Sequence, residues 1–390
     1  MSLPAAGKTR EEIGLRDIAG YFLRLGALGF GGPIALAGYM QRDLVERRGW
    51  ITQEEYLEGL AVAQTMPGPL AAQLAMWLGY VRRGFWGAVA AAVPFILPPF
   101  LIVTIVAALY VAFSGSNLIQ ALFYGIGPTV IALILRGAWK LLNVTVKSDR
   151  RLWAIFTVVA SATFVVRSEV AILFLLSGLV GVFLYAPPSW ARLRAAPAIL
   201  PLGFANVAAA TQSADLNTLL ALGIFFFKAG AFTFGSGLAI VPFLQQGVVH
   251  DFGWLSEREF LDAIAMGMIT PGPVVITAVF VGYLVAGLAG ATIAAIGVFL
   301  PPFLMVVLLG PWIMRHRKRP AVQGFTKGAT AAAAGAIVGA AGVIATQVIV
   351  DVPTAILFAL AFGILWRWKV SEPLLVGASA LAGLALFGFR

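Results

Sequence analysis

The sequence repeats itself, and the repeat breaks long apolar segments at matched places. The stretch Phe22–Gly32 (FLRLGALGFGG) aligns with Phe226–Ser236 (FFKAGAFTFGS), 204 residues further along the chain. The other matched pairs are Gly49-Trp50 with Gly253-Trp254, Pro67-Gly68-Pro69 with Pro271-Gly272-Pro273 and, after one deletion, Pro98-Pro99-Phe100 with Pro301-Pro302-Phe303. Agreement over about 80 residues indicates an internal duplication rather than chance.

The composition places this duplication in a membrane. Of the 390 residues, 60% are hydrophobic and 11% charged, and the apolar residues form long runs. Each run suits a hydrocarbon layer roughly 30 Å thick, which a helix of about 20 residues crosses. We therefore expect an all-α integral membrane protein with two repeats and about 10–12 transmembrane segments, six apolar segments to each half. The predicted division is residues 1–186 for the first repeat, 187–217 for a linker and 218–390 for the second repeat.

The same composition disfavours several function classes. The net charge of +10 comes from short Lys and Arg clusters between apolar segments, a pattern typical of membrane topology rather than of nucleic-acid binding. The chain has no cysteine and two histidines, which argues against disulfides, iron–sulfur clusters, thiolate metal sites and redox chemistry on a substrate. No strand precedes Gly29–Gly32 and no Gly-Lys-Ser/Thr follows, so a nucleotide loop is not expected there. We predict no cofactor, no metal and no enzymatic activity.

Charges in equivalent loops predict that the two repeats are inverted. Arg82 and Arg83 precede the third segment of the first half, whereas the matched loop of the second half has no basic residue. After that segment, residues 114–117 are neutral, whereas residues 315–319 of the second half are strongly basic. Because Lys and Arg stay on the cytoplasmic side, equivalent loops lie on opposite sides.

Inversion requires an odd number of crossings in each half, so one of the six segments has to turn back. We expect the second segment to be re-entrant at Pro67-Gly68-Pro69, which puts the basic loops before and after it on the cytoplasmic side. The first segment is then expected to cross the membrane, which leaves Arg16 on the outside.

The breaks predict an anion site near the middle of the membrane. A proline after a break starts a new helix, and the new N-terminus offers free N–H groups and a positive dipole end. The candidate residues are Gly31, Gly32, Pro33, Pro67, Gly68 and Pro69 in the first half and Gly235, Ser236, Gly237, Pro271, Gly272 and Pro273 in the second. Gln64, Gln73 and Thr270 lie beside the breaks as hydrogen-bond donors to oxyanion oxygens. The alternative is that these breaks are kinks that serve helix packing.

Two charged pairs are preserved between the repeats. Arg24 and Lys228 occupy matched positions about two turns before the first break, where a buried cation would attract an anion; the alternative is that each extends to the nearer interface. Glu58 and Asp262 are also matched and are candidates for a proton relay. The alternative for this acidic pair is a solvated helix start after the N-caps Thr52 and Ser256.

At these residues the chain resembles the chromate ion transporter family in its long, duplicated form. The motifs that carry the resemblance are Phe30-Gly31-Gly32-Pro33, Arg47-Arg48-Gly49-Trp50, Gln64 with Pro67-Gly68-Pro69, Gln73 and Gly79-Tyr80 in the first half, and Phe234-Gly235, Gly253-Trp254, Pro271-Gly272-Pro273-Val274 and Gly282-Tyr283 in the second. The resemblance implies a multi-pass protein of the cell membrane that exports chromate from the cytoplasm and confers resistance, with sulfate as a related anion.

The membrane potential favours that direction for a dianion. Moving one charge across 100 mV is worth about 2.3 kcal/mol, so a dianion that leaves a negative cytoplasm gains about twice that amount. An importer of sulfate or another small oxyanion, driven by protons or sodium, is the alternative transporter. A membrane scaffold or enzyme is the remote alternative, and the oligomeric state stays open.

Overall fold

A computed structural model describes residues 13–30, 32–113, 116–146, 149–166, 171–187, 216–233, 237–368 and 370–387, and within these ranges the chain forms helices only. The helices of the first half are α1 (Leu15–Leu28), α2 (Gly32–Met40), the π-helical segment Gln41–Arg47, α3 (Gln53–Thr65), α4 (Leu70–Ala112), α5 (Asn117–Thr145), α6 (Arg150–Val166) and α7 (Ala171–Tyr185). Those of the second half are α8 (Leu216–Phe232), the 3-10 turn Gly237–Ala239, α9 (Ile240–Leu244), the π-helical segment Gln245–Asp251, α10 (Glu257–Ile269), the 3-10 turn Val274–Ile276, α11 (Thr277–Leu304), the π-helical segment Met305–Leu309, α12 (Gly310–His316), α13 (Pro320–Val348), α14 (Val352–Arg367) and α15 (Glu372–Phe387).

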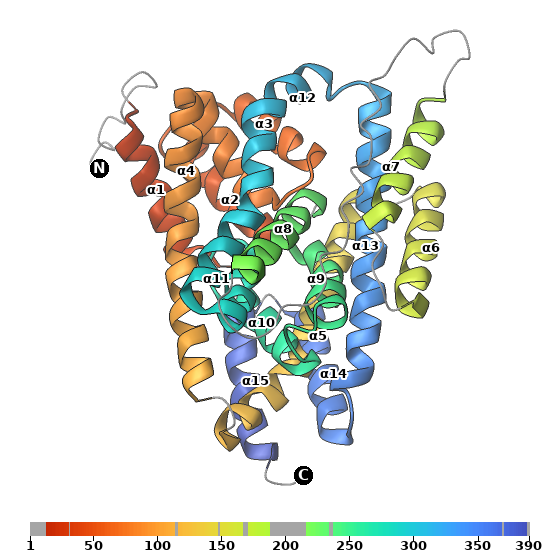
Figure 1. The fold of residues 1–390 in the computed structure, drawn as a ribbon. Coiled ribbons are helices and arrows are strands. Elements are labelled where there is room, and N and C mark those ends of the chain that lie inside the picture. Colours follow the sequence, from red (N-terminus) through yellow and green to blue (C-terminus); the bar gives the residue numbers. More distant parts are fainter. Residues whose placement is uncertain are drawn as a thin grey trace.

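Four of the described helical stretches are long and apolar enough to cross a membrane, as predicted. They are Leu70–Ala112, Asn117–Asn143, Val274–His316 and Pro320–Val348. Shorter apolar helices accompany them at Leu173–Tyr185, Leu216–Phe232, Val352–Arg367 and Glu372–Phe387. Figure 1 shows the long helices running through most of the height of the molecule. The prediction of an all-α, multi-pass membrane protein is confirmed.

The second apolar segment turns back, as predicted. Gly59 of α3 packs against the Trp77 ring of α4, and at the open end of the hairpin Arg82 forms an ion pair with Glu55. At 1.5 Å per residue, the 13 residues of α3 measure about 20 Å, too short for a bilayer. Pro67-Gly68-Pro69 therefore lies at the tip of a re-entrant hairpin.

The α4 helix reverses sharply at the end of this hairpin. Gly84 has φ of 57°, a value open to glycine, and the backbone leaves helical geometry there. Gly79 on one side of the reversal meets Gly87 and Ala91 on the other. The matched Gly287 of α11 has φ of 56°, so both halves turn at the same place.

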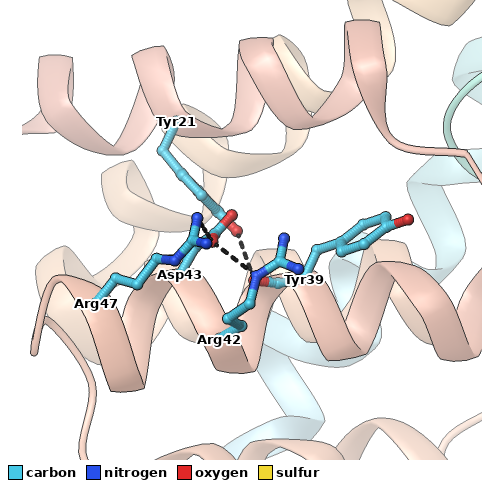
Figure 2. Close-up of polar contacts among 5 residues, drawn as sticks. All are labelled: Tyr21, Tyr39, Arg42, Asp43 and Arg47. Atoms are coloured by element: carbon cyan, nitrogen blue, oxygen red, sulfur yellow. Dashed lines mark hydrogen bonds and ion pairs between the residues drawn. The ribbon is translucent and has the colours of Figure 1, made fainter.

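The first apolar segment also turns back, which the sequence analysis did not predict. The Tyr21 hydroxyl of α1 donates to the Tyr39 carbonyl of α2 at 3.5 Å, and the Arg48 guanidinium lies 5.2 Å from the Tyr21 ring centroid. Figure 2 shows α1 alongside the helix that carries Tyr39, Arg42, Asp43 and Arg47. Because α1 and α2 form a hairpin, the start of α1 lies at the same end of the molecule as Arg48. The expectation that the first segment crosses and leaves Arg16 outside is therefore wrong, and so is the argument that a single re-entrant segment in each half accounts for the inversion.

The two repeats are inverted and interlocked. The α5 helix packs on α14 and α15 of the other half, and α13 packs on α6 and α7 in the matching way. Gly125 meets the Ser379 carbonyl in the first crossing, and Gly328, 203 residues later, meets the Ser177 carbonyl in the second. The sequence repeats are therefore not two separate globules, and the boundaries predicted for them stay a prediction. Most of the predicted linker, residues 187–217, lies outside the described ranges.

Contacts at the two ends of the molecule establish the inversion. Arg317 at the end of α12 pairs with Glu58 of α3 at 2.6 Å, close to the Arg82–Glu55 pair. Tyr110, near the end of α4, instead meets Asp262 of α10 at the opposite end, with a hydroxyl-to-carboxylate distance of 2.7 Å. The matched ends of α4 and α11–α12 thus lie at opposite ends of the molecule.

Candidate functional site

Residues beside all four breaks line one cavity of about 540 Å³. From the first half, Gly32 and Pro33 start α2, Gln64 lies in the last turn of α3 and Leu70 starts α4. From the second half, Leu238, Met268 and Val274 line the cavity beside their breaks; they match Ile34, Gln64 and Leu70 of the first half, which also line it. Residues beside the breaks of both repeats therefore surround one space, and the prediction that this space binds an anion stays a prediction.

The Pro-Gly-Pro motifs themselves do not line this cavity. The Gly272 N–H donates to the Gly29 carbonyl at 2.9 Å, and the Gly68 N–H donates to the Thr233 carbonyl, the matched atom of the other half. A Cβ at Gly68 would lie 2.8 Å from Pro302, and one at Gly272 would lie 2.9 Å from Pro99. Each tip thus docks on the double proline of the other repeat. These N–H groups form hydrogen bonds across the contact between the two repeats, which we call the seam. Gly68 and Gly272 therefore fit the alternative in which the breaks serve helix packing.

The predicted hydrogen-bond donors separate into one cavity residue and two structural ones. Gln64 is exposed to the cavity although it lies deep in the hairpin. Gln73 is fully buried, and its Nε2 donates to the Pro67 carbonyl at 2.6 Å. The Thr270 hydroxyl donates to the Met266 carbonyl at 2.6 Å. Gln73 and Thr270 therefore brace the breaks, and Gln64 is available to a bound molecule.

Three cations that were not predicted as site residues line the cavity wall. Arg136 and Lys140 lie one turn apart on α5, and Lys327 lies on α13. Among the described lining residues Glu372, at the start of α15, is the one that is acidic, so these residues give the cavity a formal charge of +2 from three cations and one anion. A cavity with this charge, lined by helix starts and an amide, suits a small anion.

Neighbouring side chains hold one of these cations, Lys327, in place. The Lys327 ammonium lies 4.6 Å from the Tyr185 ring centroid, a cation–π distance. The Tyr185 hydroxyl donates to Asp149 in the loop before α6, and this hydrogen bond lowers the pKa of that carboxyl. The cavity wall is thus tied to the loop that joins α5 and α6.

Arg24 and Lys228 lie elsewhere. Arg24 is exposed on α1 beside Leu23, which is 45% exposed, while Phe22 and Leu25 on the other face pack inward. Lys228 is half-buried on α8, and neither side chain lines the cavity. The position of a cation along a segment was visible in the sequence, but the face it occupies depends on helix packing.

The remaining predicted residues are placed as follows. Gly237 is buried beside Val274 without lining the cavity. Gly31, Gly235 and Ser236 lie outside the described residues. Pro69, Pro271 and Pro273 are buried at the seam and Pro67 is half-buried. Glu58 and Asp262 lie at opposite ends of the molecule in the contacts with Arg317 and Tyr110, away from the cavity lining.

Comparison with known proteins identifies the family. The chromate transporter family model matches residues 16–182 and again 220–384, once for each repeat. The chain belongs to the chromate transporter family. Within this family it is 50% identical to a chromate transport protein of Cupriavidus metallidurans over 98% of this chain and 96% of the relative. A probable chromate transport protein of Synechococcus elongatus is 47% identical over 95% of each chain. No solved structure matches the chain.

Membership of the chromate transporter family agrees with the geometry. The family model covers the hairpins of α1–α4 and α8–α11 and the long helices α5 and α13, and these parts build the cavity. A multi-pass membrane transporter explains why irregular backbone lies at membrane depth, since such backbone is tolerated where it borders a cavity or is buried in protein.

Proposed function

We propose that this protein exports chromate, a tetrahedral divalent oxyanion, from the cytoplasm across the cell membrane and so confers chromate resistance. The observation that carries the proposal is the cavity of charge +2 that is lined by residues beside all four breaks. The names of the relatives point to the same substrate.

Binding rests on three kinds of group in this cavity. Arg136, Lys140 and Lys327 supply positive charge, Gln64 supplies an amide donor, and the starts of α2 and α4 supply backbone dipoles. A divalent anion is matched by the net charge of +2, whereas a neutral solute gains nothing from it. We retain Gly32, Pro33 and Gln64 of the sequence prediction as contact residues.

Exposed and half-buried lining residues of the cavity gather at one end of the molecule, which supports an opening there, and the basic loops at that end favour the cytoplasmic side. Gln41, Lys140 and Lys327 line its walls on the side of the basic loops that contain Arg48, Arg82 and Arg317. Basic loops stay in the cytoplasm, so the cavity takes up its anion from that side. Release follows when the two repeats rock against each other around the breaks, the usual motion of inverted-repeat transporters.

The membrane potential is sufficient to drive export. A dianion that leaves a cytoplasm held at −100 mV gains about 4.6 kcal/mol, so no coupling ion is required. Purified protein in liposomes with the potential set to either sign tests this directly. We expect chromate flux toward the positive side without a proton or sodium gradient. Flux that needs such a gradient, and runs inward for sulfate, would support the importer instead, and no anion flux under any gradient would support a scaffold.

A further inference from the structure

The two repeats have matching backbones, but the cations that line the cavity have uncharged residues at the matched positions of the other repeat. The α5 and α13 helices have 29 residues each and keep the same register, since Gly125 and Gly328 make equivalent contacts. This register gives each cavity cation a counterpart in the other repeat. The counterparts are Gly339 for Arg136, Val343 for Lys140 and Tyr124 for Lys327.

The matched positions differ in exposure in this structure. Lys140 is exposed and Val343 is 5% exposed, and Gln64 is exposed whereas its counterpart Met268 is 6% exposed. Gln41 is half-buried, while the matched Gln245 is buried. At these three pairs the first repeat's residue is thus the more exposed one, and its counterpart in the second repeat is packed.

We infer that the transporter holds its anion tightly when it faces the cytoplasm and weakly when it faces outward, because the cavity cations occur on one side of the repeat symmetry only. When the repeats exchange conformations, the outward cavity is lined by the counterparts, and Gly339, Val343 and Tyr124 bring no positive charge to it. The proposal rests on the oxyanion transport proposed above and adds an asymmetry between the two faces.

The asymmetry affects saturation and not the final equilibrium. A passive carrier stops when the electrochemical potentials are equal, whatever its affinities, so different sites cannot drive net transport by themselves. They do set the anion concentration that half-saturates each face. A charge-assisted hydrogen bond contributes about tenfold or more in affinity, so we expect the half-saturating chromate concentration to be at least about tenfold lower on the cytoplasmic face.

The test uses the full chain in sided liposomes at zero potential, with initial chromate flux measured from each face. The variant Arg136→Gln/Lys140→Gln should bring the ratio of the two half-saturating concentrations toward one. The matched control Lys318→Gln removes a cation that is exposed at the same end but outside the cavity, and it should leave the ratio unchanged.

Two results would overturn the inference while leaving the proposed function in place: equal half-saturating concentrations in the unmodified protein, or an unchanged ratio in the double variant. Absence of chromate flux in the unmodified protein would overturn the proposed function itself. If the double variant does not assemble, the variant Tyr124→Lys tests the inference instead. It adds a cation at the counterpart of Lys327 and should lower the half-saturating concentration on the outer face, and no change there would count against the proposal.

Discussion

The backbone N–H of Gly272 donates a 2.9 Å hydrogen bond to the carbonyl oxygen of Gly29, and this bond joins the tip of one repeat's second hairpin to the tip of the other repeat's first hairpin. Gly68 and Thr233 form the symmetric bond. Two equivalent bonds across the seam mean that the Pro-Gly-Pro motifs hold the breaks of both repeats in register around the cavity.

The seam predicts a strong effect of a single methyl group. In Gly68→Ala the new Cβ would lie 2.5 Å from Gln73 Nε2 and 2.8 Å from Pro302, and the φ of 138° disfavours any residue but glycine. We expect a loss of about 1–3 kcal/mol of stability and a large loss of transport. Thermal unfolding in detergent and chromate flux measure the two. Gly20→Ala on α1 is the control, since nothing lies within 4 Å of its added Cβ. Equal behaviour of the two variants would refute the role of the seam.

Gln64 is predicted to contribute directly to anion binding. Replacing it with methionine installs the residue found at the matched position of the other repeat and removes the amide donor from the cavity. We expect transport efficiency to fall about tenfold with little change in stability. Flux kinetics check this, with the exposed Gln323→Met on α13 as the control. A Gln64→Met protein with unchanged kinetics would show that the amide makes no contact with the anion.

Arg136 and Arg24 give opposing predictions for the counter-charge. The structure places Arg136 in the cavity wall and Arg24 on the exposed face of α1, so Arg136→Gln should reduce chromate transport at least tenfold more than Arg24→Gln does. Both variants remove one arginine from an apolar segment, which makes them matched controls for membrane insertion. The reverse order of effects would restore Arg24 as the site residue predicted from the repeat.

The Glu58–Arg317 pair is predicted to be structural. Its side chains are 34% and 18% exposed, so the coupling between them should be modest, about 0.5–1 kcal/mol in a double-mutant cycle of Glu58→Gln and Arg317→Gln. Thermal unfolding of the four proteins measures this coupling. Chromate flux should fall less in Glu58→Gln than in Gly68→Ala. Complete loss of flux in Glu58→Gln, with normal folding, would instead support the proton relay predicted from the sequence.

Asp149 predicts a dependence of stability on pH. The hydrogen bond from Tyr185 lowers the pKa of this carboxyl in the folded protein, so its contribution is present above the usual value of 3.8 and is lost as the pH falls through the lowered pKa. Tyr185→Phe should have a lower free energy of unfolding than the unmodified protein at neutral pH. The difference in free energy of unfolding between the two proteins should shrink in acid. Unfolding curves at pH 7 and near pH 3 compare the two. A difference that grows on acidification would contradict the assignment.

The sequence predicted the fold well where local chemistry determines it. Glycine and proline in apolar runs identify breaks, and loop charges identify sidedness, so the duplication, the inversion and the hairpin at Pro67-Gly68-Pro69 were accessible. The hairpin of α1 and α2 was not, because a glycine break in a helix is compatible with a kink as well as with a reversal. Only contacts such as Tyr21 with Tyr39 distinguish the two.

The candidate site was predictable in part. The breaks indicate where the cavity lies along the chain, and Gln64, predicted to bind the anion, lines that cavity. Arg136 and Lys140 lie in the last turns of an apolar segment, where cations normally extend to the interface, and the sequence does not reveal that α5 presents this face to the breaks. The preserved pair Arg24 and Lys228 was a misleading signal for the cavity, because repeat symmetry retains residues for packing and for membrane anchoring as well.

The exchange of α5 and α13 between the halves has a consequence for how such a chain arises and assembles. In the first half, one side of α5 is covered only by α14 and α15 of the second half. In the second half, one side of α13 is covered only by α6 and α7 of the first half. A gene cut between the halves should therefore yield two fragments that are unstable alone and complement each other when produced together. A half-length ancestor would have needed to insert in both orientations and pair with itself before duplication fused the two copies.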